Sequence, residues 1–207
     1  GVVACTRGAP PTALAAPVAS SDGAVVARQG VEVTDADALR ALAATLPEGS
    51  LDLLVCNAGV LTRQSWADAG EWDYAEMRST IDVNAMGPLI TVRELRRALA
   101  PGAKVLLVSS LMGSLADNTS GGMYAYRMSK AAANMAFVSL AKDLGKQGVA
   151  VGIVHPGFVN TDMTGPYGGG GISAEAAGRG VADRAAELTL ETAGRMVAGK
   201  TGKVEEW

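Results

Sequence analysis

Residues 51–59 of the chain read Leu-Asp-Leu-Leu-Val-Cys-Asn-Ala-Gly, an apolar run that ends in polar and small residues. A short, nearly continuous apolar run is typical of a strand that is covered on both faces of a parallel sheet. Asparagine and glycine at its end indicate a turn at the carboxyl edge of that sheet. The stretch therefore predicts a buried strand near the centre of an α/β protein.

Other short apolar runs alternate with longer helical patterns on both sides of this stretch. Strands are expected at Val2–Cys5, within 25–33, and at 104–109, 149–154 and 195–197, and helices at 35–46, 72–100, 126–145 and 174–188. Repeated β-α units of this kind predict a doubly wound parallel sheet of the Rossmann type. One domain over residues 1–207 accounts for the whole pattern.

Composition and charge exclude several functional classes. A hydrophobic content of 48% is enough for a core on both faces of a sheet. The net charge of -3, with acids and bases mixed along the chain, argues against a nucleic-acid partner. No apolar run reaches the ~20 residues of a membrane span, so none is expected. Cys5 and Cys56 both fall in expected strands, which favours reduced core thiols over a metal site, and a location in the cytoplasm or an organelle matrix or stroma.

The chemistry is expected at the carboxyl edge of the sheet, where residues that follow different strands meet. Tyr126 and Lys130 are one helical turn apart on the same face of an expected helix. An ammonium within about 4 to 6 Å favours the phenolate and so lowers the pKa of a tyrosine. Ser110 follows the preceding strand and can offer its hydroxyl to a substrate carbonyl oxygen. Tyrosine and lysine at this spacing are a weak signal alone, because many surface helices carry the pair by chance.

Several ordered motifs together resemble the short-chain dehydrogenase/reductase family, and more narrowly its C-factor-like, carbonyl-reductase-type branch. The resemblance runs from Val2 to Trp207. It rests on residues 57–59, 84–88, 109–113 and 126–130, and on Pro156-Gly157 with Thr161.

The resemblance implies a role for each matching position. Tyr126 would be the general acid, Lys130 would bind the nicotinamide ribose and lower the pKa of the tyrosine, and Ser110 would orient the substrate oxygen. Asn84 would hold a water that links Lys130 to solvent. The remaining cofactor contacts would come from Asn57, Ala58, Gly59, Pro156, Gly157 and Thr161. The implied reaction is reduction of a carbonyl compound to an alcohol, or the reverse, by hydride transfer.

Arg7 and Glu32 concern the choice of cofactor. Arg7 follows the first strand, where an arginine can accommodate the 2′-phosphate of NADP, so NADP is favoured and NAD stays possible. A solvated arginine at the end of a strand explains the same residue almost as well. Glu32 stands where family members usually carry an aspartate near the adenine, which leaves the adenine contact open.

The family's first strand and its glycine-rich phosphate-binding turn have no counterpart at the start of the sequence. Val2–Cys5 resembles the second strand of the family, and the glycines 165, 169 and 171 lack the strand and helix that a phosphate turn requires. Loss of a central strand would leave two edges unpaired. We therefore expect a further segment before Gly1 in the natural protein. A non-catalytic relative that signals, or serves as a subunit of a larger assembly, is the alternative.

The region 164–190 is expected to form the substrate loop and a lid, because residues 168–171 are all glycine. Trp66, Trp72 and Trp207 are expected to be packing anchors. By resemblance, small residues on the helix that carries Tyr126 imply a homo-oligomer. The expected partner is a small carbonyl or alcohol substrate, whose identity the sequence leaves open.

Overall fold

The computed structural model describes residues 1–67, 70–165, 168 and 170–207. The strands are β1 Val2–Cys5, β2 Val25–Arg28, β3 Leu51–Cys56, β4 Leu99–Val108, β5 Ala150–His155 and β6 Met196–Ala198. The α-helices are α1 Thr12–Ser20, α2 Ala36–Ala44, α3 Tyr74–Ile81, α4 Gly87–Leu95, α5 Tyr124–Gly145 and α6 Ala174–Glu187. A π-helix, η1 Asp82–Met86, joins α3 to α4, and two short 3₁₀ helices are η2 Arg96–Ala98 and η3 Leu111–Gly113.

Both sheets of the protein are parallel. β3, β4, β5 and β6 form a four-stranded sheet in that order, while β1 and β2 form a separate two-stranded sheet. The expected strands are all present, and β3 has the predicted bounds. The predicted helix over 72–100 is wrong at its end, because β4 already begins at Leu99. Pro101 lacks the N–H that another helical turn would need.

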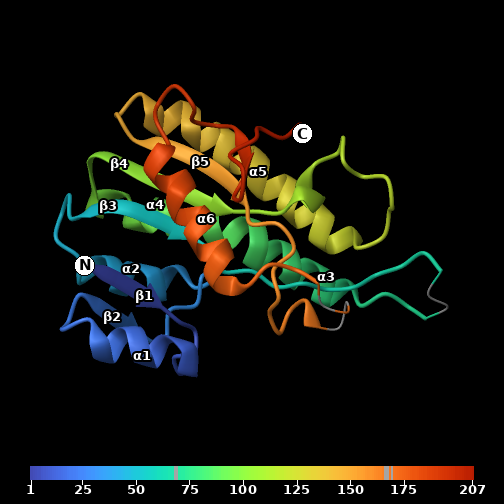
Figure 1. Cartoon of the computed structure of the whole chain (residues 1–207), viewed down its shortest axis with the longest axis horizontal. Helices are drawn as coiled ribbons and strands as arrows, with labels where there is room; N and C mark the ends of the chain where they lie inside the picture. Colours follow the sequence, from blue (N-terminus) through green and yellow to red (C-terminus); the bar gives the residue numbers. More distant parts are fainter. Residues whose placement is uncertain (68–69, 166–167, 169) are drawn as a thin grey trace.

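Helices cover the four-stranded sheet on both faces, as a doubly wound fold requires (Figure 1). On one face, Val105 and Leu107 of β4 pack with Phe137 of α5 and Val92 of α4. On the other face, Leu106 packs with Ala185 and other residues at the end of α6. Alternate residues of β4 therefore point into two different apolar layers, which confirms the three-layer Rossmann-type architecture.

Local sequence explains where two of the helices begin. The sequence leaves Thr34 or Asp35 as the cap of the helix expected at 35–46, and in the structure the Asp35 carboxylate caps α2 by accepting hydrogen bonds from the backbone N–H groups of Asp37 and Ala38. The Ser173 hydroxyl caps α6 in the same way through the N–H of Ala176. That helix lies in the expected 164–190 region, of which residues 166, 167 and 169 are outside the described part.

In the part of the chain that the structure describes, no strand pairs with both β1 and β3, so the two sheets are separate. Apolar side chains on both strands are therefore exposed to solvent. On β1, Val2 is 58% exposed and Val3 41%; on β3, Leu53 is 41% exposed and Val55 39%. Figure 1 shows β1, α1 and β2 as a block beside the four-stranded sheet. This arrangement agrees with the prediction that Val2–Cys5 is not the central strand of the fold.

The structure corrects one prediction about the two cysteines. Cys56 is buried at the end of β3, as expected, but Cys5 at the end of β1 is exposed rather than part of the core. In the described part of the chain, no helix combines the length and the apolar character that crossing a membrane requires.

The core under α5 gives a first prediction. Phe137 is 0% exposed, so Phe137→Ala should lower the free energy of unfolding by about 3–5 kcal/mol through lost burial and a cavity. Met135 on the same helix is 67% exposed, and Met135→Ala should change it by less than about 1 kcal/mol. Urea unfolding of both variants measures the difference. Equal losses would contradict the assignment of the α5 face that packs on the sheet.

Candidate active site

Ser110 lies in the turn that follows β4, at the carboxyl edge of the sheet. Its hydroxyl accepts a hydrogen bond from the N–H of Met112 at 3.2 Å and so caps the short helix η3. Gly113 ends that helix against α5, where an added Cβ would lie 2.9 Å from the Lys130 backbone carbon and 2.7 Å from the Asn134 amide nitrogen. Only glycine allows this approach, which brings the turn that carries Ser110 onto α5.

Tyr126 and Lys130 share a face of α5, as predicted. The Tyr126 hydroxyl is hydrogen-bonded to Ser110, and the Lys130 ammonium lies 5.8 Å from the centre of the Tyr126 ring. Lys130 is only 5% exposed, and its ammonium donates to the carbonyl oxygen of Val108 at 3.1 Å. The structure therefore brings together the three side chains that the sequence singled out.

Asn84 joins the turn after β3 to α5. Its side-chain oxygen accepts from the N–H of Val60 at 2.8 Å, and its amide donates to the Val60 carbonyl oxygen at 2.8 Å and to the Ser129 hydroxyl at 2.9 Å. Gly59 packs beside it, because an added Cβ would lie 3.3 Å from the Asn84 oxygen and 3.6 Å from the Lys130 nitrogen. The expected role of Asn84 in holding a water stays a prediction.

Burial sets the protonation states at this site. It lowers the pKa of the Lys130 ammonium to about 8, from 10.5. Burial also raises the pKa of Tyr126, and the hydrogen bond from Ser110 offsets only part of that rise. The expectation that Lys130 lowers the pKa of the tyrosine stays a prediction, and burial is the larger effect on the Tyr126 pKa. The low-polarity surroundings disfavour both charged forms.

The residues expected on the nicotinamide side follow β3 and β5. Asn57 and Ala58 are exposed directly after β3. Pro156 and Gly157 follow β5, and Gly157 has a φ of +85°, a conformation that favours glycine. β5 lies beside β4, and the Ser109 N–H donates to the Val154 carbonyl oxygen at 2.7 Å. Thr161 is exposed further along this loop, and no contact joins it to Tyr126 or Lys130.

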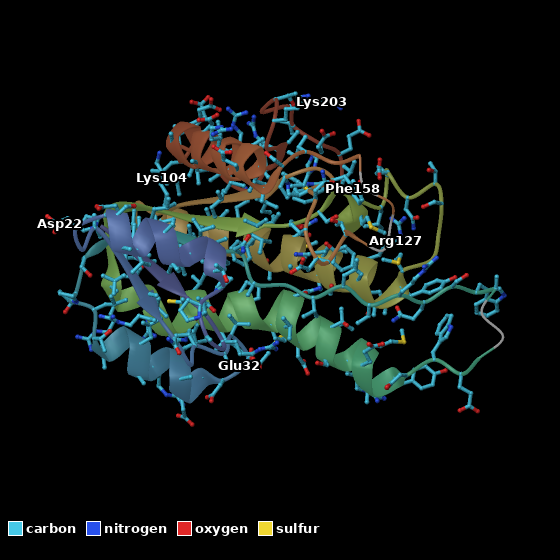
Figure 2. All side chains as sticks on the ribbon, turned by 60° about the horizontal axis from the view of Figure 1, so that its bottom comes forward. Asp22, Glu32, Lys104, Arg127, Phe158 and Lys203 are labelled. Carbon is cyan, nitrogen blue, oxygen red and sulfur yellow. The ribbon has the colours of Figure 1, made fainter. Side chains whose placement is uncertain are left out.

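Arg7 and Glu32 lie at the ends of the separate β1–β2 sheet. They form an ion pair with 3.7 Å between Arg7 Nη1 and Glu32 Oε2, and the Arg7 side chain is 77% exposed. Figure 2 shows Glu32 well apart from Arg127, which directly follows Tyr126 on α5. The two residues proposed for the adenosine end of the cofactor are thus close to each other and distant from the predicted catalytic group.

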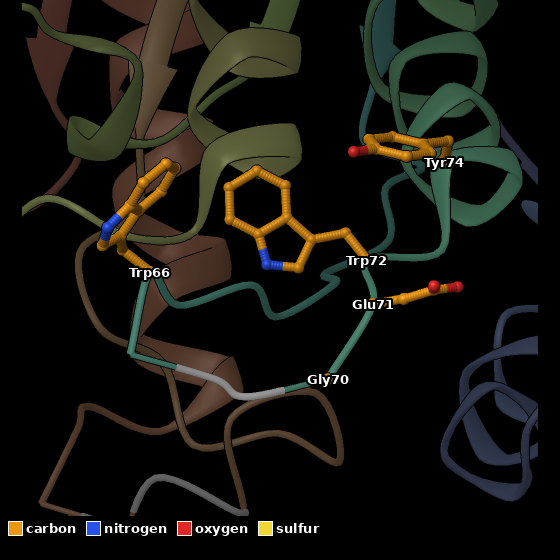
Figure 3. Close-up of a pocket in the computed structure, with 5 residues that line it drawn as sticks. All are labelled: Trp66, Gly70, Glu71, Trp72 and Tyr74. Atoms are coloured by element: carbon orange, nitrogen blue, oxygen red, sulfur yellow. The ribbon is translucent and has the colours of Figure 1, made fainter.

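An aromatic group borders the start of α5. The Trp72 ring lies 4.9 Å from the Tyr124 ring and 5.9 Å from the Trp66 ring. Trp66 and Trp72, with Tyr74 and Glu71, line a surface hollow of about 530 Å³ (Figure 3). Trp66 is 83% exposed, so it is not the packing anchor that we expected.

Sequence reasoning missed the residue that holds this loop to α5. Gln64 is 4% exposed, its carbonyl oxygen accepts from the Met123 N–H at 2.8 Å, and its side-chain oxygen accepts from the Ala125 N–H at 3.1 Å. Gln64 therefore supplies the cap that α5 lacks locally. A glutamine in a loop gives no signal of this role, because its partners are about sixty residues away in the chain.

Comparison with known proteins places the chain in a family. The family model described as short chain dehydrogenase matches residues 1–169. The 1-hydroxy-2-glutathionyl-2-methyl-3-butene dehydrogenase of Rhodococcus sp. strain AD45 is 45% identical over 177 residues, which are 83% of this chain and 76% of that protein. The C-signal protein of Myxococcus xanthus is 48% identical over 130 residues, 62% of this chain and 77% of that protein.

Solved structures give the same result for the fold. The NADPH-bound carbonyl reductase from chicken fatty liver is 25% identical with a TM-score of 0.86, and the comparison covers 100% of this chain and 87% of the reductase. A carbonyl reductase from Pseudomonas aeruginosa PAO1 in complex with NADP is 27% identical with a TM-score of 0.79, over 100% and 88% of the two chains. The chain belongs to the short-chain dehydrogenase/reductase family of oxidoreductases.

Proposed function

We propose that the protein is an NADP(H)-dependent oxidoreductase that reduces a carbonyl compound to an alcohol, or catalyses the reverse reaction. The observation that carries the proposal is the hydrogen bond between Ser110 and Tyr126 with the buried Lys130 ammonium beside the tyrosine ring. A phenol that reaches a neighbouring hydroxyl at the sheet edge can give a proton to an oxygen bound between them.

The chain's own residues divide the work of this reaction. Ser110 donates a hydrogen bond to the carbonyl oxygen and holds it beside Tyr126. The Tyr126 hydroxyl gives its proton to that oxygen, and in the reverse direction the phenolate takes it back. Lys130, held by the Val108 carbonyl, stabilises the phenolate that forms. When bound, the nicotinamide supplies the hydride that completes the reduction at the carbonyl carbon.

The described residues fit one end of the cofactor better than the other. Around the nicotinamide end, Gly59 has no side chain to block the space beside Lys130, and Pro156 and Gly157 follow the neighbouring strand. Arg7 would face the 2′-phosphate and Glu32 the adenine. Between β1 and β3, no glycine-rich turn is present among the described residues to hold the pyrophosphate.

A non-catalytic role is the second candidate. One relative bears the name C-signal, and this favours the second candidate. A signalling or assembly subunit would keep the fold without binding a nicotinamide. Fluorescence titration with NADPH separates the candidates, since saturable binding supports the oxidoreductase and no binding at millimolar NADPH supports the second role.

Tyr126→Phe tests the proposed acid. The variant keeps the ring but lacks the proton donor, so carbonyl reduction followed by NADPH absorbance should fall by about 10²- to 10⁴-fold in kcat. Tyr124→Phe is the matched control. Tyr124 lies two residues before Tyr126 on the helix, and its ring packs on Trp72. Its kcat should stay within about twofold of the parent. A Tyr126→Phe protein as fast as the parent would exclude the mechanism.

Arg7→Gln tests the choice of cofactor. If Arg7 contacts the 2′-phosphate, the variant should weaken NADPH binding by about 10-fold and leave NADH binding unchanged. Arg97→Gln is the control, since Arg97 is exposed and pairs with Glu48 in another part of the molecule. Equal effects of Arg7→Gln on both cofactors would refute the contact.

Lys130→Met tests the charge state of the buried lysine. The folded pKa near 8 is below 10.5, so the unfolded chain binds more protons between these values and the stability of the parent rises with pH there. The free energy of unfolding of the parent, minus that of Lys130→Met, should increase by about 2 kcal/mol from pH 7.5 to 9.5. The buried Cys56 thiol, whose pKa is raised to about 12, is present in both proteins and cancels. A constant difference would show that burial leaves the lysine pKa unchanged.

A further inference from the structure

Three aromatic side chains and one carboxylate line the surface hollow beside the start of α5. In this aromatic hollow, Trp66, Trp72 and Tyr74 supply the rings and Glu71 supplies the carboxylate. Figure 3 shows the Trp72 ring between Trp66 and Tyr74. The Trp66 and Trp72 rings are inclined at 76° to each other, with 5.9 Å between their centres. Two indole rings at nearly a right angle form a corner, so one small ligand can contact both.

The Trp72 ring is held in place from two directions. Its Nε1–H donates to the carbonyl oxygen of Ser65 at 3.4 Å. The Tyr124 ring packs on it with 4.9 Å between the centres and 33° between the planes. Tyr124 is the first residue of α5. This wall of the hollow is preformed, so binding of a ligand does not have to order it.

The other two rings are open to solvent. Trp66 is 83% exposed and Tyr74 is 63% exposed. Tryptophan is highly buried on average, and an exposed indole leaves a large apolar surface in contact with water. The core of the protein does not use these two rings, whereas a ligand in the hollow would cover part of them.

The chemistry of the lining favours a cation. The faces of aromatic rings carry negative potential, and tryptophan attracts a cation most strongly within about 6 Å of the ring centre. Glu71 is the only charged side chain among the described residues that line the hollow. Arg78 donates to the carbonyl oxygen of Tyr74 at 3.5 Å from further along α3 and is not part of the lining. The ring faces and the carboxylate therefore attract the same sign of charge.

We propose that the aromatic hollow binds a small organic cation that carries a methylated ammonium group. The methyl groups pack on the ring faces, and the rings and the Glu71 carboxylate attract the positive charge. A primary ammonium is strongly hydrated and has three N–H groups that need acceptors, which indole faces do not supply. The hollow shares no lining residue with the proposed catalytic group of Ser110, Tyr126 and Lys130, so it is a second site.

Choline and 3,3-dimethylbutan-1-ol test the proposal, because they have the same shape and differ by a charged nitrogen in place of a carbon. NMR titration of the whole isotope-labelled chain follows the indole N–H signals of its three tryptophans. Choline should shift the Trp66 and Trp72 signals saturably and leave that of Trp207, which is outside the lining, unchanged. Choline should bind about 10-fold more tightly than the neutral alcohol.

Substitution of Trp66 tests the ring, with the Trp72 signal as the readout. Trp66→Leu keeps an apolar side chain without a ring, so it should weaken choline binding about 5-fold and change alcohol binding by less than about twofold. Trp66→Phe keeps a ring and should retain most of the affinity. Trp207→Leu is the matched control and should bind choline as the parent does. The exposure of Trp66 means that these variants keep the fold.

Substitution of Glu71 tests the charge. Glu71→Gln should weaken choline binding about 2- to 5-fold and leave binding of the neutral alcohol unchanged. Glu191→Gln is the control, because Glu191 is exposed in the segment after α6 and does not line the hollow. It should bind both compounds as the parent does. Equal weakening of choline by the two variants would show an effect of net charge alone and would count against the site.

Other results would also overturn the proposal. Equal affinity for choline and the alcohol would show an apolar surface without selection for charge. Tighter binding of ethanolamine than of choline would exclude the methylated group. Absence of a saturable shift at tens of millimolar choline would show that no such site exists. Trp66 and Trp72 signals that respond to protein concentration instead of choline would show a contact between two copies of the chain.

The inference is independent of the proposed function. The indole signals report binding without turnover, whereas NADPH titration and Tyr126→Phe test the oxidoreductase. A protein that binds choline through Trp66 and reduces no carbonyl keeps the inference and loses the proposed function. A protein that reduces ketones through Tyr126 and binds choline no better than the alcohol does the opposite.

Discussion

The site depends on the three hydrogen bonds of one buried amide. The Asn84 side chain binds both backbone polar groups of Val60 and the hydroxyl of Ser129, so it fixes the turn after β3 relative to α5. Asn84 lies in the π-helix η1, whose extra residue per turn separates α3 from α4. With this contact in place, Gly59 lies beside Lys130, and Lys130 reaches the end of β4. The ends of β3 and β4 thus meet α5 in one small volume, because the Asn84 side chain bonds to both backbone groups of Val60 and to α5.

The electrostatics of the site follow from burial more than from pairing. Lys130 has a neutral backbone carbonyl as its hydrogen-bond partner and no carboxylate among the described residues, so the cost of removing its charge from water is only partly compensated. Tyr126 has a hydroxyl partner, and its phenolate is disfavoured for the same reason. Proximity of an ammonium to a phenol does not by itself make the phenol acidic. Whether burial raises or lowers a pKa depends on which form of the group is charged. The size of the shift depends on how much hydration that form loses, and packing determines this loss.

The comparison of sequence and structure shows which features are local. The bounds of β3 and the cap at Asp35 were predictable because an apolar run and a capping aspartate act within a few residues. The shared face of Tyr126 and Lys130 follows from helical geometry alone. The exposure of Cys5 and Trp66 and the cap from Gln64 depend on neighbours distant in the chain. Nε and Nη1 of Arg127, which are buried without a hydrogen-bond partner among the described residues, belong to the same class.

The segment that contains β1, α1 and β2 differs from the four-stranded sheet in local stability. Hydrogen bonds within a continuous sheet make its strands unfold together, whereas β1 and β2 bond only to each other. The helix between them, α1, has no buried residue and contains Pro17, so it adds little local stability. The amide protons of α1 should therefore exchange with solvent at a lower opening free energy than those of β4 and β5.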